Sequence, residues 1–297
     1  MNRSMKLLVV GGTSRAAIAF RAYIAGIPEI DVTVLCRRQT NSYPSEKIII
    51  TDDYFSCPPS TLEGVDVVVN FVGITKGTAS ELEMLNAAGP QKLARTADAA
   101  GVRQWIQISS LSVYGTAKDI DDQTPVHPLT PYGRSKLAGD EALSSVGGSL
   151  GVTLLRVPIL YSATARGKLH MLARTMETLG FFPVPTSLQP RSVLHLDNLA
   201  NAIMISIRSS LTGIQFAADP EPFTIEKLAD VIGDKTGRRP KLIRLPNSTF
   251  ALLKRLKPGI HTSLYERSLI APQYNLLSTS ENLRALDAGL AEVITQK

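Results

Sequence analysis

The chain has 297 residues, of which 44% are hydrophobic and 20% charged, as in a soluble globular protein with a sizeable core. Its two cysteines and four histidines show no disulfide or metal-ligand spacing, so we expect no metal site. The net charge is +6, but the basic residues are dispersed without interleaved aromatic residues. This argues against nucleic acid and favours an anionic small molecule as partner. No stretch reaches transmembrane length and the first apolar run is too short for a signal peptide, so we expect a cytoplasmic protein.

Short apolar runs alternate with helical segments through the first half of the chain. The predicted strands are Lys6–Val10, Val32–Cys36, Lys47–Thr51, Val65–Phe71, Gln104–Ser109 and Thr153–Val157. The predicted helices are Ala16–Ala25, Ala79–Ala100 and Pro131–Ser144. Because the strands are apolar throughout rather than alternating, they are expected to be buried on both sides. The alternation therefore predicts an α/β fold, with a parallel sheet covered by helices on both faces.

The second half is less regular. The proline-rich run Phe181–Pro190 predicts an interruption of regular structure. We expect helices over His195–Arg208 and over Thr224–Thr236, the latter with Thr224 as N-cap and Gly237 just past its end. Gly213–Ala217 is a predicted strand, and the C-terminal third is predicted to form a small lobe. The basic amphipathic stretch Phe250–Lys257 predicts a surface helix with one buried stripe, with contact to a membrane as the alternative.

A turn of small residues lies between the first strand and the first helix. It consists of Gly11, Gly12, Thr13, Ser14 and Arg15. Backbone N–H groups in such a turn can approach a pyrophosphate at the helix N-terminus. The full three-glycine pattern is absent, so a plain tight turn remains the alternative. Its place after the first strand favours a dinucleotide site.

The second strand ends in Arg37 and Arg38, where sites selective for NAD usually carry an acidic residue. Guanidinium groups bind phosphate through a planar fork, so the pair favours the 2′-phosphate of NADP(H), with NAD(H) as the alternative. Arg15 is placed to reach the same group. After the third strand, Asp52 is a candidate for the adenine amino group, and a turn-capping role for this or the next aspartate is an equal alternative.

The chemistry is predicted by Ser109–Gly115 followed by Tyr132 and Lys136. Positions i and i+4 share one face of a helix, so the phenol and the ammonium can point to the same place. A nearby positive charge favours phenolate, so we expect a lowered pKa for Tyr132. Ser110 can hold a substrate oxygen. These are the groups needed to move a proton on or off an alcohol while a cofactor exchanges hydride.

Together these motifs resemble the extended short-chain dehydrogenase/reductase family, in its epimerase/dehydratase branch of nucleotide-sugar enzymes. The resemblance rests on GGTSRAA, GVDVVVNFVG, Asn86 with AAGP, GVRQWIQISSLSVYG, YGRSK, LRVPILYS, RSVLHLDNLANAI and FTIEKLADVIG. It implies a Rossmann-type doubly wound sheet over 1–165, to which 193–218 return, and a substrate-binding lobe over 166–297. It further implies Ser110, Tyr132 and Lys136 as the catalytic residues. Asn70, Val72, Gly73 and Val157 are implied at the cofactor.

Within the family, the segment from Arg156 to Asn198 is similar to enzymes of polysaccharide and O-antigen sugar synthesis. The resemblance implies Ser110, Ser112, Lys168 and Arg191 as substrate-binding residues, with Arg191 on the diphosphate. Lys168 stands where the family has asparagine, and Ser162 where it has glycine. His195 is expected to be a structural hydrogen-bonding residue rather than a catalyst.

The expected activity is NADPH-dependent reduction of a 4-keto UDP-sugar, with an NAD-dependent 4-epimerase as the alternative at the same site. A 4,6-dehydratase is less favoured, because such enzymes resemble this one but carry Thr-Asp-Glu where this chain has Ser110-Leu111-Ser112. A non-catalytic dinucleotide sensor and a reductase of small non-sugar carbonyls are further alternatives. The resemblance also implies a homodimer through Ala79–Ala100 and Pro131–Ser144.

Overall fold

The computed structural model describes residues 4–164, 167–256 and 258–294, which form two compact units. Unit 1 consists of Met1–Gly115, Val126–Val157 and Leu199–Ala217. Unit 2 consists of Thr116–Pro125, Pro158–Asn198 and Ala218–Lys297. The chain therefore enters unit 2 briefly before residue 126 and passes into it again at Pro158, a few residues before the predicted boundary at 165.

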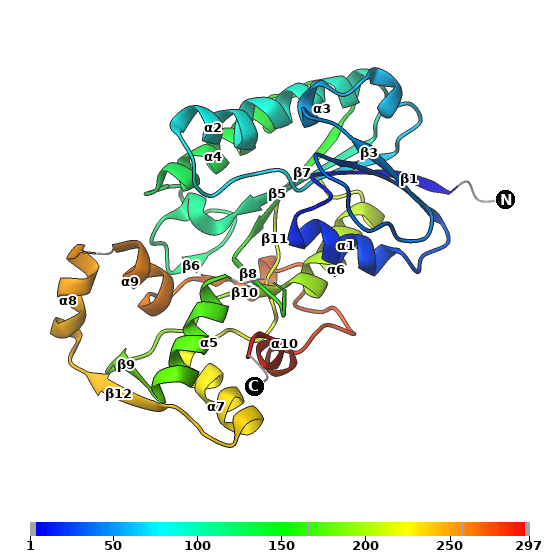
Figure 1. Cartoon of the computed structure of the whole chain (residues 1–297). Helices are drawn as coiled ribbons and strands as arrows, with labels where there is room; N and C mark the ends of the chain where they lie inside the picture. Colours follow the sequence, from blue (N-terminus) through cyan, green and yellow to red (C-terminus); the bar gives the residue numbers. More distant parts are fainter. Residues whose placement is uncertain (1–3, 165–166, 257, 295–297) are drawn as a thin grey trace. The chain divides into compact units, whose positions relative to one another are not determined.

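Unit 1 is built on a seven-stranded parallel sheet in the order β3-β2-β1-β4-β5-β7-β11 (Figure 1). Its strands are β1 Met5–Val10, β2 Ile30–Cys36, β3 Glu46–Ile50, β4 Val67–Asn70, β5 Gln104–Ser110, β7 Gly151–Val157 and β11 Gly213–Phe216. Its helices are α1 Arg15–Ile24, α2 Ala79–Glu83, α3 Gly89–Ala99, α4 Pro131–Ser144 and most of α6 Leu196–Arg208. The Rossmann-type fold is confirmed. The strand order reverses between β1 and β4, and ligands of such sheets bind beyond the carboxyl ends of the strands at this point.

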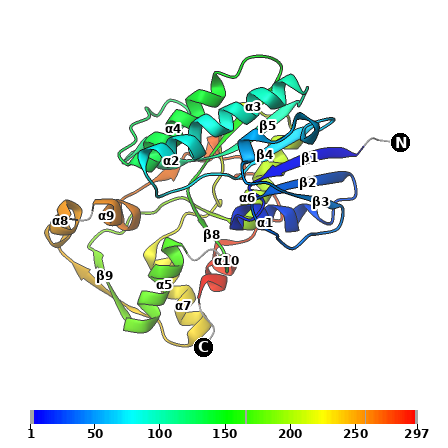
Figure 2. The same ribbon diagram turned by 45° about the horizontal axis from the view of Figure 1, so that its top comes forward.

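Helices cover both faces of this sheet, α1 and α6 on one side and α2, α3 and α4 on the other (Figures 1 and 2). The central strands are accordingly buried along their length: Val67–Asn70 is buried at every position, and Leu7–Val10 is at most 1% exposed. Unbroken apolar runs are stable only in such a layer. Thr130 begins α4 as its N-cap, accepting from the Gly133 N–H at 3.0 Å.

The predicted helix over Ala79–Ala100 contains one wider turn, Met84–Ala88, between α2 and α3. Pro90 has no N–H to donate inside a helix, and its ring crowds the carbonyl four residues earlier, which accounts for the local widening. Gly89 lies against Phe55, where a Cβ would come within 2.2 Å of the ring. The wide turn carries the buried side chain of Asn86.

Unit 2 combines short parallel strand pairs with helices. Its strands are β6 Asp119–Ile120, β8 Ile159–Tyr161, β9 Phe181–Pro185, β10 Val193–His195, β12 Lys241–Leu245 and β13 Leu269–Ile270, paired β8 with β10, β9 with β12 and β6 with β13. Its helices are α5 Lys168–Leu179, α7 Ile225–Thr236, α8 Asn247–Leu256, α9 Pro258–Tyr265 and α10 Leu286–Val293. Leu172, Met176, Leu228, Ile232 and Leu290 belong to its core.

One expectation about this half was wrong, and both predicted helices are confirmed. Phe181–Pro185 forms β9 rather than irregular structure, because a strand paired on one side tolerates prolines that cannot donate. His195 ends β10, and the helix predicted from it begins one residue later, at Leu196. Thr224 does cap α7, and Gly237 ends it with φ +71°.

The predicted surface helix corresponds to α8, and Lys257 at its end lies outside the described residues. Phe250 is 6% exposed and packs edge-on against Tyr265 with ring centroids 4.9 Å apart, which supplies the buried side of α8. Leu256 is exposed. Within residues 4–164, 167–256 and 258–294, none of the helices has the length and apolar character needed to cross a membrane.

Candidate active site

Ser110 and Tyr132 meet at the carboxyl end of β5. Ser110 is the last residue of β5, where its Oγ accepts from the Ser112 N–H at 3.1 Å and so starts a tight turn. The first turn of α4 packs directly on that turn, since a Cβ on Gly133 would come within 2.7 Å of the Ser112 carbonyl. The Tyr132 and Ser110 side chains are hydrogen-bonded there. Val157 ends the neighbouring strand β7, in register with Ser110.

The phenol of Tyr132 is less acidic than expected from the sequence. Burial raises its pKa above the ordinary value; the hydrogen bond with Ser110 opposes this rise, and the negative charge of Asp140 adds to it. The predicted lowering of the Tyr132 pKa is therefore wrong, because burial and the charge of Asp140 outweigh the hydrogen bond with Ser110. A further positive charge beside the phenol would be needed to bring it into the range for proton transfer.

Lys136 is 4% exposed, and its ammonium donates to the Ile108 carbonyl at 2.7 Å. This carbonyl belongs to β5, so the bond ties α4 to the strand that carries Ser110. Burial lowers the pKa of Lys136 to about 8, and the charge of Asp140, one helical turn further on, opposes that fall. The amine thus titrates close to neutral pH, which is typical of a functional lysine.

Asn86 is a site residue whose role the sequence did not reveal. Its Nδ2 donates to the Ser135 Oγ at 2.8 Å and to the Ile74 carbonyl at 2.9 Å, while its Oδ1 accepts from the Ile74 N–H at 2.9 Å. It therefore fixes the loop after β4 to the helix that carries Tyr132 and Lys136. The signal was present, since Asn86 precedes the Ala-Ala-Gly-Pro run, but it does not identify the partners.

The loop after β4 lies against the turn after β1. Asn70 is fully buried; its Oδ1 accepts from the Val72 N–H at 3.0 Å and its Nδ2 donates to the Gln107 Oε1 at 2.9 Å. A Cβ on Gly11 would come within 2.8 Å of the Val72 side chain, and one on Gly73 within 3.0 Å of the Asn86 Oδ1. The predicted residues of these two segments are thus brought together at one edge of the sheet.

The turn itself requires its glycines. Gly11 has φ +80°, a conformation that favours glycine. A Cβ on Gly12 would come within 2.1 Å of the Val34 side chain, so the helix can approach the strand this closely only at glycine. Ser14 is the N-cap of α1 and accepts from the Ala17 N–H at 3.1 Å, while Thr13 and Arg15 are exposed. The N–H groups of the first helical turn have no intrahelical acceptor and suit an anion.

A buried ion pair supports this turn and was missed from the sequence. Arg21 of α1 is fully buried and forms a bidentate ion pair with Glu46 of β3. Its Nε donates to Oε1 at 2.8 Å and its Nη2 to Oε2 at 2.7 Å. Its Nη1 also donates to the Gly12 carbonyl at 2.9 Å, and its Nη2 to the Asn41 carbonyl at 2.6 Å. Arg21 therefore fixes the glycine turn and the loop after β2 in one arrangement.

The predicted residues for the far end of a dinucleotide are exposed. Arg37 and Arg38 follow the carboxyl end of β2, and the Arg37 guanidinium lies 5.5 Å from the centroid of the Tyr54 ring. Asp52 is exposed as well. The next residue, Asp53, takes the turn-capping role and accepts from the Phe55 N–H at 2.8 Å.

In unit 2, the two predicted substrate cations lie near each other. Arg191 is 8% exposed and donates to the carbonyls of Thr262 and Glu266, at 2.8 and 3.4 Å. Burial lowers the pKa of Arg191 to about 10, and the nearby Glu266 opposes this. Loss of hydration and the charge of Arg191 lower the pKa of Lys168. Two cations that repel each other in this way are a common feature of anion sites.

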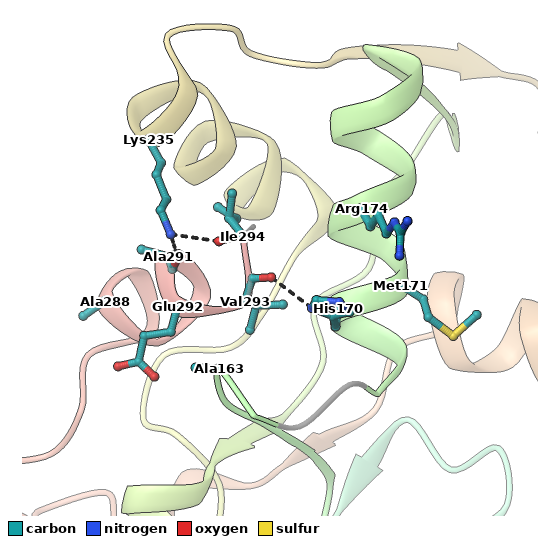
Figure 3. Close-up of a pocket in the computed structure, with 10 residues that line it drawn as sticks. All are labelled: Ala163, His170, Met171, Arg174, Lys235, Ala288, Ala291, Glu292, Val293 and Ile294. Carbon is teal, nitrogen blue, oxygen red and sulfur yellow. Dashed lines mark hydrogen bonds between the residues drawn. The ribbon is translucent and has the colours of Figure 1, made fainter. Parts of the chain in front are cut away.

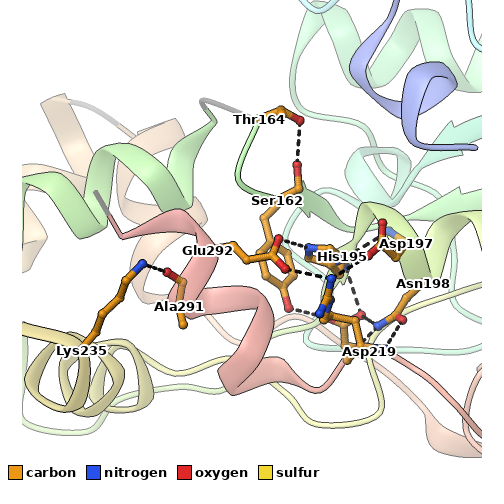
Figure 4. Close-up of polar contacts among 11 residues, drawn as sticks. Ser162, Thr164, His195, Asp197, Asn198, Asp219, Lys235, Ala291 and Glu292 are labelled. Atoms are coloured by element: carbon orange, nitrogen blue, oxygen red, sulfur yellow. Dashed lines mark hydrogen bonds and ion pairs between the residues drawn. The ribbon is translucent and has the colours of Figure 1, made fainter. Parts of the chain in front are cut away.

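His195 is buried in a polar cluster of unit 2 (Figure 4). Its Nε2 contacts the Glu292 carboxylate at 3.2 Å, and its backbone N–H donates to Asp219 at 3.1 Å. Asp219 also accepts from the Asn198 amide at 2.7 Å and from the Tyr161 hydroxyl at 2.7 Å. Every one of these contacts joins segments of unit 2, in agreement with the expected structural role of His195.

A cavity of about 1010 Å³ in unit 2 is lined by α5, α7 and α10 (Figure 3). Lys235 donates to the carbonyls of Ala291 and Ile294, and His170 contacts the Val293 carbonyl at 3.1 Å. These contacts satisfy carbonyls at the end of the last helix, as cations there commonly do. The lining contains none of the site residues predicted from the sequence.

Residues 7–216 match the model of the NAD dependent epimerase/dehydratase family. This match covers more than half of the sequence. The chain belongs to this family. Its members are NAD(P)-dependent enzymes of the extended short-chain dehydrogenase type, as the sequence predicted.

The chain is 22% identical, over 72% of its length, to N-acetyl-alpha-D-glucosaminyl-diphospho-ditrans,octacis-undecaprenol 4-epimerase of Escherichia coli O157:H7. It spans 66% of that protein and 50% of another relative, an uncharacterized protein of Sinorhizobium fredii. UDP-glucuronic acid 4-epimerase of Bacillus cereus, solved with NAD, has a TM-score of 0.76 at 16% identity, covering 97% of both chains. UDP-N-acetylglucosamine 4-epimerase of Methanobrevibacter ruminantium gives 0.77 at 16% identity, over 98% of this chain and 97% of that one. At these identities the structural likeness shows the fold.

Proposed function

We propose that this protein is a 4-epimerase that oxidises and then re-reduces carbon 4 of a sugar carried on a diphosphate. The observation that carries the proposal is the hydrogen-bonded pair of Ser110 and Tyr132 at the carboxyl edge of a Rossmann-type sheet, with the buried Lys136 ammonium one turn along the helix that carries Tyr132. Three of the similar proteins are named as 4-epimerases of UDP-linked or polyprenyl-diphosphate-linked sugars. These names support 4-epimerisation as the proposed activity.

The residues at the sheet edge fit a dinucleotide. Gly11 and Gly12 leave the space that a Cβ would fill, and the first turn of α1 offers N–H groups to a pyrophosphate. The loop Asn70–Gly73 would border the nicotinamide ribose, and Lys136 would reach its hydroxyls. When bound, a nicotinamide dinucleotide accepts hydride from the sugar carbon or returns it.

The chain's own residues would handle the proton. Tyr132 takes the proton from the sugar hydroxyl during oxidation and gives it back during reduction, and Ser110 holds the same oxygen. Because burial raises the pKa of the phenol, the positive charges of Lys136 and of an oxidised nicotinamide ring would both be needed to lower it. Leu111 and Ser112 offer no carboxylate pair, so these positions supply no acid and base for eliminating water.

A diphosphate-linked substrate is supported by the two cations of unit 2. Arg191 keeps its Nε buried without a hydrogen-bond partner among the residues that the structure describes. A guanidinium with a free donor, beside the ammonium of Lys168, suits a doubly charged phosphate group. Ser112 likewise has a buried hydroxyl that lacks a partner in the described part of the chain, and it is available to a sugar hydroxyl.

A second candidate, NADPH-dependent reduction of a 4-keto sugar, is favoured by one observation. Arg37 and Arg38 are both exposed at the end of β2, where a 2′-phosphate would lie and where no carboxylate faces the ribose. An epimerase regenerates its cofactor in every cycle, whereas a reductase consumes it. The two activities use the same Ser110, Tyr132 and Lys136.

The experiment is an assay of the purified protein with UDP-N-acetylglucosamine, its polyprenyl-diphosphate-linked counterpart and a UDP-4-keto-6-deoxyhexosamine. Epimerisation without net change in cofactor absorbance supports the first proposal, and stoichiometric NADPH oxidation with the keto sugar supports the second. Tyr132→Phe should abolish either reaction. Dinucleotide binding without turnover on any of these substrates would overturn both and leave a dinucleotide sensor. Thermal protection by UDP tests separately whether a nucleotide diphosphate is bound.

A further inference from the structure

A chain of charges lies behind the catalytic helix, and the reaction as described does not use it. Asp140 is on α4, one turn beyond Lys136, and is 2% exposed. Its Oδ2 accepts from the Arg156 Nε at 2.9 Å. Arg156, on β7, is 4% exposed and donates through Nη1 to the Tyr114 hydroxyl at 2.5 Å. Its guanidinium also lies 5.1 Å from the centroid of the Tyr114 ring.

The hydrogen bonds of Asp140 are incomplete. Its Oδ1 is buried and has no hydrogen-bond partner among the described residues, so one oxygen of a buried carboxylate is left unsatisfied. A pair kept only for stability would be expected to use both oxygens, because an orphaned buried acceptor costs free energy. Positions four apart lie on the same helix face, so this carboxylate and the Lys136 ammonium face the same interior.

We propose that Asp140 is a positioning residue, whose carboxylate, fixed by Arg156, keeps the buried Lys136 ammonium charged where Tyr132 exchanges its proton. The inference rests on the proposed function, since it assigns a task to a residue that does not touch the substrate. Buried without a compensating negative charge, Lys136 would lose its proton more readily. The neutral amine would no longer favour the phenolate of Tyr132.

Few other ionisable groups compete for this role. The elements against α4 carry Glu81 and Glu83 on α2, Lys92, Arg95 and Asp98 on α3, Tyr114 in the turn after β5 and Arg156 on β7. Asp98 is occupied by the N–H groups of Ser149 and Leu150, each at 3.0 Å, and Glu81 caps α2. Of the acidic side chains, Asp140 is the one whose charge acts against the effect of burial on Lys136.

The test is the pH profile of kcat/KM for Asp140→Asn against wild type. Wild type should lose activity as Lys136 deprotonates, near its pKa of about 8. In the variant this alkaline limb should move at least one pH unit lower, so that the variant is at least about fivefold less active at pH 8 and close to wild type at pH 6. A purely structural role would lower activity equally at both values. An unchanged alkaline limb, or a uniform loss, overturns the proposal.

Glu141→Gln is the matched control, since it removes one negative charge from the next position of α4, where the side chain is exposed. Its alkaline limb should coincide with that of wild type. If Asp140→Asn does not fold, the double variant Asp140→Asn with Arg156→Gln removes both charges and leaves no unpaired buried ion. Its alkaline limb should still lie below that of wild type.

A second readout needs no substrate and so separates this proposal from the proposed function. A lysine whose pKa is lowered on folding makes the protein more stable as pH rises from its folded pKa to its unfolded pKa. The difference in unfolding free energy between wild type and Lys136→Met should therefore rise from about pH 8. In the Asp140→Asn background the rise should begin at lower pH. The same starting pH in both backgrounds refutes the coupling, even if the enzyme proves active.

Discussion

The two units each contain a buried polar network, and the networks differ in how fully their hydrogen bonds are satisfied. In unit 2, Asp219 accepts through Oδ1 from the His195 N–H and the Asn198 amide, and through Oδ2 from the Tyr161 hydroxyl (Figure 4). Both carboxylate oxygens are used, by donors from three elements, β8, β10 and α6. Such a network stabilises one arrangement of the chain, and none of its buried side-chain polar atoms lacks a hydrogen-bond partner among the described residues.

In unit 1, by contrast, one of the two Asp140 carboxylate oxygens has no hydrogen-bond partner within the described part of the chain, and the pKa of Lys136 is lowered towards neutrality. Buried charge that is incompletely paired is costly to stability, and it is common at functional sites. The comparison suggests a division of roles. Substitutions in the network of unit 1 should change the chemistry more than the stability, and substitutions in the network of unit 2 should do the reverse.

The largest effect is expected from Tyr132→Phe. Without the hydroxyl no proton can be exchanged with the sugar oxygen, and kcat should fall by about 10²–10⁴-fold, equivalent to about 3–5 kcal/mol of the barrier. The thermal unfolding temperature should stay within a few degrees of wild type, because the ring and its packing are kept. Turnover within tenfold of wild type would show that another group carries the proton.

Asp219→Ala should give the largest loss of stability. It leaves the Tyr161 hydroxyl, the Asn198 amide and the His195 N–H without their buried acceptor, at a cost of about 3–4 kcal/mol in unfolding free energy by urea titration. Asp219→Asn is the matched control. Its carbonyl can serve the two donors at Oδ1 and its amide can donate to Tyr161, so a change below about 1 kcal/mol is expected. Equal losses in both variants would mean that the hydrogen bonds are not what stabilises the cluster.

A smaller steric effect is expected from Gly289→Ala on α10. The added Cβ would come within 2.9 Å of the Tyr161 hydroxyl oxygen and 3.0 Å of the His195 ring, so the cluster must shift. Overpacking of this kind costs about 1–3 kcal/mol. Gly26→Ala is the control, because no atom lies within 4 Å of its added Cβ, and it should be neutral or slightly stabilising. Indistinguishable urea midpoints for the two variants would contradict the tight packing around Tyr161.

The same contrast explains what the sequence could predict. Ser110, Tyr132 and Lys136 lie within 27 positions of one another, and strand ends and helix faces follow from local patterns. The glycine turn after β1 is equally local. Arg21 was missed, and Asn86 was named for the resemblance without a role. The reason is that their partners, Glu46 and Ser135, are brought to them by the packing of separate elements.

Unit 2 depends on contacts between distant positions. The Tyr161 hydroxyl reaches a residue 58 positions away, and the His195 ring one 97 positions away, so no spacing in the sequence indicates them. Pro183 within β9 was a misleading signal, because a parallel pair with β12 outweighs the local preference of proline. The lowered pKa expected for Tyr132 failed for a similar reason, since burial depends on the whole fold.

The smallest predicted effect is a pH dependence that distinguishes the two networks. Burial raises the pKa of Asp219 above its ordinary value of 3.8, although the bonds from Asn198, Tyr161 and His195 oppose this. As pH rises above about 4, the carboxyl therefore ionises first in the unfolded chain, and the folded state loses stability by up to about 1.4 kcal/mol per pH unit until it ionises as well. The unfolding free energy of wild type should fall relative to that of Asp219→Asn over this interval.

This pH dependence of stability has the opposite sign to that expected from Lys136, whose lowered pKa makes stability rise with pH above about 8. Urea titrations of both proteins between pH 4 and 8 measure the difference, and a wild type that gains on the variant as pH rises would show that hydrogen bonding outweighs burial at Asp219.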